Sequence, residues 1–179
     1  MSSNAIKVNQ WIQVSRSTPS KPTLLQDKKK AKMLLGLILE ELLELGQSIE
    51  DGVSVMEELL IEKIEEIQSG KIVQNSPKLE DSLDALVDLE VVIHNTTTEL
   101  GLSTVYQNNF KRVMDSNYSK FDKDMDAAKL SMQKYANQGV KTYAEYSDRG
   151  VYVIKREDGK ILKGAGYKPP VITLNPFTK

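Results

Sequence analysis

Two acidic segments about forty residues apart contain the side chains of this sequence that are best suited to chemistry. In the first segment, residues 37–49 (LILEELLELGQSI), the acids are Glu40, Glu41 and Glu44. In the second, residues 79–95, the aspartates are Asp81, Asp84 and Asp88. Carboxylate oxygens are the ligands that Mg²⁺ and Mn²⁺ prefer in proteins. If both segments are helical and face each other, the pattern predicts a divalent-metal site.

Helical geometry places the acids of each segment on one side. At about 100° per residue, Glu40 and Glu44 lie about 40° apart, and Glu41 lies about 60° from Glu44. In the second segment the polar stripe extends to Asn95, and its four members fall within an arc of about 60°. Leucine, valine and isoleucine surround both stripes. Each helix is therefore expected to present an acidic strip within an apolar surface.

Two interpretations of these strips compete. Acids at this spacing are often just solvent-exposed, but neither strip has the lysines at i+4 that usually accompany a solvated acidic face. Facing carboxylates that are partly buried lose hydration and repel each other, at a cost of several kcal/mol per group. A hard divalent cation offsets both costs. A histidine-rich zinc or di-iron site is disfavoured, because His94 is the only histidine and there is no cysteine.

The elements that must position these acids are predicted to be helices. The helical segments are expected at residues 4–15, 24–49, 53–69, 77–100, from Ser103 onward, and 122–138. A loop is expected over 15–23, which has two prolines. From Lys141 the character changes, and alternating residues with turn signals at 148–150 and 158–159 predict a β-hairpin over 142–156. The expected organisation is a helical domain, residues 1–138, followed by a hairpin and an irregular tail, residues 139–179.

These motifs resemble a known family. The pattern EExxE at 40–44, followed by DxxxDLxVVIxNxxxELG at 84–101, is similar to the all-α nucleoside triphosphate pyrophosphohydrolases. That group includes MazG proteins, dimeric dUTPases and phosphoribosyl-ATP pyrophosphohydrolases. RVMDSNYSKF, residues 112–121, resembles the segment that follows the second metal helix in the family. The tail KREDGKILKGAGYKPP, residues 155–170, resembles the end of phage and bacterial members. The implied fold is an all-α bundle of four to five helices.

The resemblance also implies roles for individual residues. Glu41 and Glu44 match the first pair of metal ligands, Asp88 closes the second pair, and Glu40 matches a residue that binds a further metal or orients the attacking water. The family's ExxD pattern would require an acid where Ala85 stands, so either Asp84 or the pair Asp81 and Asp84 takes that place. The residues expected to contact the substrate are Asn95, Lys111, Arg112, Asn117 and Lys120, with Trp11 as a candidate for the base or for the core.

The implied reaction is hydrolysis of a (deoxy)nucleoside triphosphate to the monophosphate and pyrophosphate, with two or three Mg²⁺ ions (or Mn²⁺) at each site. The candidate substrates are dUTP, dCTP and dGTP, with phosphoribosyl-ATP as an alternative. A P-loop mechanism is excluded because no GxxxxGK[ST] motif is present. A different class stays open: a helical oligomerisation or adaptor module without enzymatic activity, whose acids are simply exposed.

Composition and surface pattern give the expected setting of the protein. The formal net charge of −1 gives no sign of a nucleic-acid surface, and the apolar run at 33–43 is too short and too acidic to cross a bilayer. No signal peptide is evident at the N-terminus. A cytoplasmic protein, bacterial or phage-encoded, is expected. The helix at 33–45 is apolar around most of its circumference, which predicts a homodimer or a dimer of dimers.

Overall fold

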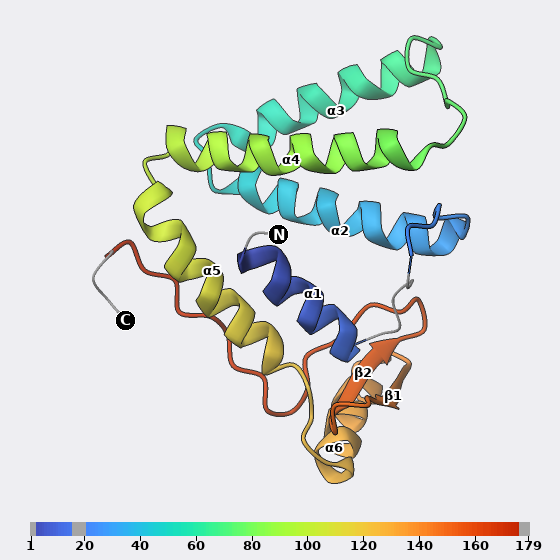
Figure 1. Ribbon diagram of the computed structural model, residues 1–179, viewed down its shortest axis with the longest axis vertical. Helices are drawn as coiled ribbons and strands as arrows, with labels where there is room; N and C mark the ends of the chain where they lie inside the picture. Colours follow the sequence, from blue (N-terminus) through green and yellow to red (C-terminus); the bar gives the residue numbers. More distant parts are fainter. Residues whose placement is uncertain (1–2, 16–20, 176–179) are drawn as a thin grey trace. The chain divides into compact units, whose positions relative to one another are not determined.

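A computed structural model describes residues 3–15 and 21–175, and it divides the chain into two compact units (Figure 1). The first unit combines residues 1–22 with residues 82–179, and the second is Thr23–Asp81. The structure is mostly helical with one small antiparallel sheet, as the sequence predicted. The predicted division at residues 138 and 139 falls within the first unit.

In the first unit, helix α1 (Ser3–Ser15) packs along helix α5 (Ser103–Tyr118). Asn4 and Gln107 exchange two hydrogen bonds between their side-chain amides, of 3.1 and 2.5 Å. Further along, the indole N–H of Trp11 donates to the carbonyl of Asn117 at 2.9 Å. The two helices therefore run in the same direction and are joined near both of their ends.

Part of the core of the first unit lies where helix α6 (Met125–Ala136) packs on the β-hairpin (Figure 1). Strands β1 (Thr142–Tyr146) and β2 (Tyr152–Arg156) pair in antiparallel register, with Ala144 opposite Ile154. The backbone of Asp122 adds a bridge to Tyr152 on the outer side of β2. The buried apolar residues of this unit are Val105, Met114, Phe121, Ala128, Val153 and Ile154.

The second unit consists of helix α2 (Lys28–Gln47) and helix α3 (Gly52–Gln68), which pack against each other. The short turn between them contains Asp51 in the left-handed conformation, with φ of 54°. The residues that this pair of helices buries are two glycines, Gly46 and Gly52. A helix pair of this kind has no hydrophobic core of its own.

Helix α4 (Leu79–Glu99) joins the two units and lies in the first from Ser82 onward. None of its residues is buried. Its apolar residues are exposed all round, with Leu83 at 64 %, Leu86 at 59 % and Val92 at 59 %. Such a helix presents a large apolar surface that the first unit itself does not cover.

Several predicted boundaries need correction, and the reasons are local. Helix α2 begins at Lys28 and not at residue 24, because the Asp27 carboxylate accepts hydrogen bonds from the backbone N–H groups of Lys29 and Lys30. Ser103 is not the cap of α5; the cap position is Leu102, and the Ser103 hydroxyl lies 3.2 Å from that of Thr98. The hairpin is confirmed, while the central part of the predicted loop, 16–20, lies outside the described residues.

Among the helices in the described part of the chain, none is both long enough and apolar enough to cross a membrane.

Candidate functional site

Helix α2 carries the first acidic strip. It is helical throughout Glu40–Glu44, so the spacing that the sequence predicted between these acids holds. All three glutamates are exposed, and so are neighbouring leucines such as Leu39 and Leu42, at 41 % and 46 %. The second unit therefore presents Glu41 and Glu44 one turn apart on an apolar surface.

Helix α4 carries the second strip in the same manner. Asp84 and Asp88 stand one turn apart within it, Asp81 lies in its first turn, and Asn95 lies near its end. All four are exposed. Val87 is 52 % exposed and Leu89 is 42 % exposed beside them, so this strip too lies within an exposed apolar surface.

Five of the candidate metal ligands have no side-chain partner among the residues that the structure describes. In the described ranges, 3–15 and 21–175, the side chains of Glu41, Glu44, Asp81, Asp84 and Asp88 form neither a hydrogen bond nor an ion pair. Nor do three or more histidine, aspartate or glutamate side chains gather there closely enough to hold a metal ion. The structure keeps the acids paired within each helix, and the two pairs belong to different units.

The candidate substrate residues on α5, and Lys120 just after it, are mostly in contact with the rest of the first unit. The Arg112 guanidinium donates to the carbonyl of Val171 at 2.9 Å. Asn117 accepts the indole N–H of Trp11 through its backbone carbonyl. Lys120 places its ammonium 5.8 Å from the centre of the Trp11 ring. Lys111 is exposed on the surface of the helix.

Trp11, on α1, lies against the end of α5. Its ring stacks on Phe121 with the centroids 5.8 Å apart, and Phe121 in turn makes an edge contact with Tyr118. Since its one polar atom is satisfied by Asn117, Trp11 joins the two helices as an aromatic anchor. This arrangement favours the core role over the base-binding role that the sequence left open.

His94 lies outside both acidic strips. Its ring and that of Tyr106 form an edge-to-face contact, with their centroids 5.7 Å apart. Its Nε2 is 3.9 Å from a carboxylate oxygen of Glu90, one turn earlier in the helix. Both side chains of that pair are more than half exposed. His94 therefore lies on the exposed surface of α4.

A buried polar cluster around Asp122 was not predicted from the sequence. Asp122 is 1 % exposed and accepts the Ser131 hydroxyl at 2.6 Å and the Ala165 amide at 2.9 Å. Gly164 lies against it, and its amide donates to the carbonyl of Lys120. Asp122 stands between two helices in the sequence, so only the fold reveals that it binds a segment forty residues away.

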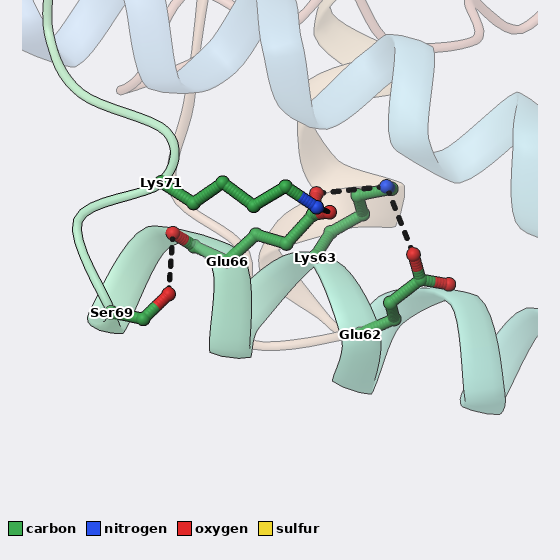
Figure 2. Close-up of polar contacts among 5 residues, drawn as sticks. All are labelled: Glu62, Lys63, Glu66, Ser69 and Lys71. Atoms are coloured by element: carbon green, nitrogen blue, oxygen red, sulfur yellow. Dashed lines mark hydrogen bonds and ion pairs between the residues drawn. The ribbon is translucent and has the colours of Figure 1, made fainter.

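Charged side chains also gather at the end of α3 in the second unit (Figure 2). Glu66 accepts Lys63 at 2.8 Å and also contacts Lys71, beyond the helix. The hydrogen bonds from these lysines lower the pKa of Glu66, and the bond to Glu66 raises the pKa of Lys63. Glu62 lies on the other side of Lys63 at 3.3 Å. The cluster holds the chain in place as it leaves α3, and it contains none of the predicted ligands.

The surface between α2 and α3 is hollowed. A cavity of about 390 Å³ opens there, and most of its lining is apolar. The residues around it are Leu43, Gln47, Val53, Met56, Glu57, Leu60 and Ile61. None of the predicted acids lies in this lining.

Comparison of the chain with protein-family models, with curated proteins and with solved structures gave no match in any of the three.

Proposed function

We propose that this protein is a Mg²⁺-dependent nucleoside triphosphate pyrophosphohydrolase with a MazG-like helical bundle. The observation that carries the proposal is the pairing of carboxylates, one turn apart, on two helices with exposed apolar surfaces; none of the four has a side-chain partner in the described part of the chain. Glu41 and Glu44 form one pair on α2, and Asp84 and Asp88 form the other on α4. If these apolar surfaces pack together, the carboxylates lose water and repel one another unless a cation lies between them.

The donors present fit a hard divalent cation. All are carboxylate oxygens, which suit Mg²⁺ or Mn²⁺. Bound Mg²⁺ would neutralise the phosphate charge and lower the pKa of the attacking water. Glu40, next to the first pair, would orient that water or accept its proton. Water would attack at the bond between the α- and β-phosphates, and the products would be a nucleoside monophosphate and pyrophosphate.

Cations on α5 and just after its end would hold the triphosphate. Lys111 is exposed, and Arg112 and Lys120 are partly exposed. A guanidinium can bind a phosphate through two N–H groups at once, which favours Arg112 as the main contact. Asn95 and Asn117 are the amide side chains proposed for the sugar or base. For the base itself, dUTP, dCTP and dGTP are the first candidates to test, with phosphoribosyl-ATP as a further substrate.

We propose in addition that the active form is a homodimer or a dimer of dimers. The support is the surface of the second unit, which buries two glycines and no apolar side chain. A second copy would cover it and complete a bundle of four or more helices. The same exposed surface also favours a second candidate function, a helical oligomerisation module without enzymatic activity.

Removal of single ligand charges tests the enzymatic proposal. The substitutions Glu41→Gln, Glu44→Gln and Asp88→Asn should each abolish pyrophosphate release from a panel of nucleoside triphosphates while helix content stays unchanged. Asp115→Asn, an exposed acid on α5, is the matched control and should retain activity. Mg²⁺ at about 100 times its dissociation constant should stabilise the wild type by about 2.7 kcal/mol. An oligomer that releases no pyrophosphate and gains no stability from Mg²⁺ would support the non-enzymatic module.

Two further variants decide which acid completes the second pair of metal ligands. If Asp84 pairs with Asp88, Asp84→Asn should weaken Mg²⁺ binding strongly and Asp81→Asn only mildly. Isothermal titration with Mg²⁺ measures both. The reverse order would assign the pair to Asp81 and Asp84.

A further inference from the structure

The C-terminal segment 168–174, called the strap below, runs along α5 and is held through its backbone (Figure 1). The Ser116 hydroxyl donates to the carbonyl of Lys168 at 2.8 Å, and the Lys168 amide donates to the Ser119 hydroxyl at 2.8 Å. Arg112 donates to the carbonyl of Val171 at 2.9 Å. In each of these contacts a side chain of α5 meets a main-chain atom of the strap.

Asn109 makes the most specific of these contacts. Its side-chain amide donates to the carbonyl of Thr173 at 2.7 Å, and its oxygen accepts the Thr173 amide at 3.0 Å. Both backbone groups of one residue are thus bound, as a neighbouring β-strand would bind them. Asn109, Arg112, Ser116 and Ser119 are spaced by three, four and three residues, so they lie along one face of the helix.

The three large apolar side chains of the strap contribute little to its attachment. Val171 is 71 % exposed, Ile172 58 % and Leu174 73 %. The α5 face therefore recognises N–H and C=O groups that almost any residue carries. The two prolines at 169 and 170 have no N–H to satisfy and favour an extended chain.

Immediately before the strap the chain is fixed much more firmly. The Ala165 amide donates to buried Asp122 and to Ser131 at 2.9 and 2.7 Å. Between this anchor and the strap stands Gly166, where a Cβ atom would meet nothing within 4 Å. The hydrogen bonds of the strap are exposed or only part-buried, and each contributes a net free energy of the same order as the entropy lost in ordering one residue. The strap can therefore open at small cost while the anchor stays closed.

We infer that this face of α5 is a binding site for an extended polypeptide backbone, and that the strap is its detachable occupant, opening about Gly166. Each opening releases the Arg112 guanidinium from the Val171 carbonyl and exposes the face of the helix to solvent. The inference holds whether or not the chain hydrolyses nucleotides.

Hydrogen exchange on the full chain tests the opening. The amides of Lys168 and Thr173 should exchange at least about tenfold faster than those of Gly164 and Ala165, which corresponds to about 1.4 kcal/mol. Asn109→Ala should accelerate exchange at Thr173 by about tenfold more and leave Ala165 unchanged. Asn108→Ala, the same change one position earlier on the helix, is the matched control. Equal protection of strap and anchor, or loss of both together in Asn109→Ala, would overturn the inference.

A competing peptide tests what the site recognises. A synthetic peptide of residues 167–175, added at millimolar concentration to match the tethered strap, should accelerate exchange of the strap amides in the full chain. A peptide with alanine at positions 171, 172 and 174 should compete about as well. A peptide N-methylated at Thr173 should fail. Loss of competition in the alanine peptide would show that side chains are recognised and would contradict the inference. If the Asn109→Ala variant does not fold, Ser119→Ala replaces it in the hydrogen-exchange test, and exchange is then followed at the Lys168 amide.

Discussion

Asp122 shows how much a single buried carboxylate can determine in the first unit. It binds Ser131 on α6 and Ala165 in the C-terminal segment, and its backbone pairs with Tyr152 on β2. A buried polar group that loses its partner costs about 1–3 kcal/mol, and more when it is charged. Three segments distant in sequence therefore depend on Asp122. The residue that approaches its carboxylate most closely is Gly164.

That glycine gives the first prediction. A Cβ atom at Gly164 would lie 2.6 Å from the carbonyl of Lys120 and even closer to the Asp122 carboxylate. Gly164→Ala should therefore destabilise the protein by about 2 kcal/mol or more, measured by urea denaturation. Gly166→Ala, two residues later and in open space, should change stability by at most about 0.5 kcal/mol. Equal effects of the two substitutions would show that the close approach is not present in solution.

The second prediction at this scale concerns acid pH. Hydrogen bonds from the Arg156 guanidinium lower the pKa of Asp158 from 3.8 to about 2. Because the folded-state pKa lies below the unfolded value, the stabilisation is present above the unfolded pKa and is lost as pH falls through about 2. NMR titration of the Asp158 carboxyl should give that value, and Arg156→Ala should return it toward about 3.9. An unshifted pKa in the wild type would contradict the ion pair.

At the scale of elements, the turn between α2 and α3 shows why two helices can pack so closely. Asp51 adopts a left-handed conformation that costs a non-glycine residue about 1–2 kcal/mol. The backbones then meet at Gly46 and Gly52, where a Cβ on Gly52 would strike the carbonyl of Gly46. Close packing of the helix ends offsets the strain in the turn.

Two glycine substitutions in this helix pair should change the free energy of unfolding in opposite directions. Gly52→Ala should destabilise the second unit by about 2 kcal/mol or more, because backbone atoms cannot move aside as a flexible side chain can. Gly36→Ala, within α2 and with nothing within 4 Å, should stabilise it by about 1 kcal/mol through helix propensity. Thermal unfolding followed by circular dichroism measures both. Stabilisation by both variants would rule out the close turn.

At the scale of the whole molecule, the main fact is the amount of apolar surface. In the second unit fifteen large apolar residues are at least 39 % exposed. At roughly 100 Å² of apolar surface per side chain, about half of it uncovered, they expose about 750 Å². A standard protein interface buries about 800 Å² on each partner. The total apolar area exposed on the second unit is therefore similar to the area that a standard interface buries on one partner.

Light scattering at micromolar concentration checks the proposed assembly. The expected mass is at least twice the 20.1 kDa of one chain. Substituting Leu35 by Glu, at a position that is 68 % exposed, should shift the equilibrium toward smaller species because a charge would be buried in the interface. Lys32→Glu, a change of charge on an exposed polar position of the same helix, is the control. A wild-type mass equal to that of one chain would contradict the proposed assembly. The two acidic pairs would then have to meet within one chain.

The amino-acid sequence alone determined the local structure. Apolar periodicity and the alternation after residue 141 predicted the helices and the hairpin, because these elements depend on contacts between residues close in sequence. The turn spacing of Glu41 with Glu44 and of Asp84 with Asp88 followed from the same periodicity. Errors arose at helix starts, where one side chain such as Asp27 decides between adjacent positions.

Only the tertiary structure decided how distant segments use these elements. No local pattern distinguishes Asp122 from an exposed loop acid, since its burial depends on Ser131 and Ala165 arriving from elsewhere in the chain. The same holds for Arg112. The sequence predicted that it contacts a phosphate, and in the fold it donates a hydrogen bond to the Val171 carbonyl. Hydrogen bonds to backbone atoms leave no mark on the sequence of the segment that is bound, because every residue supplies the same carbonyl.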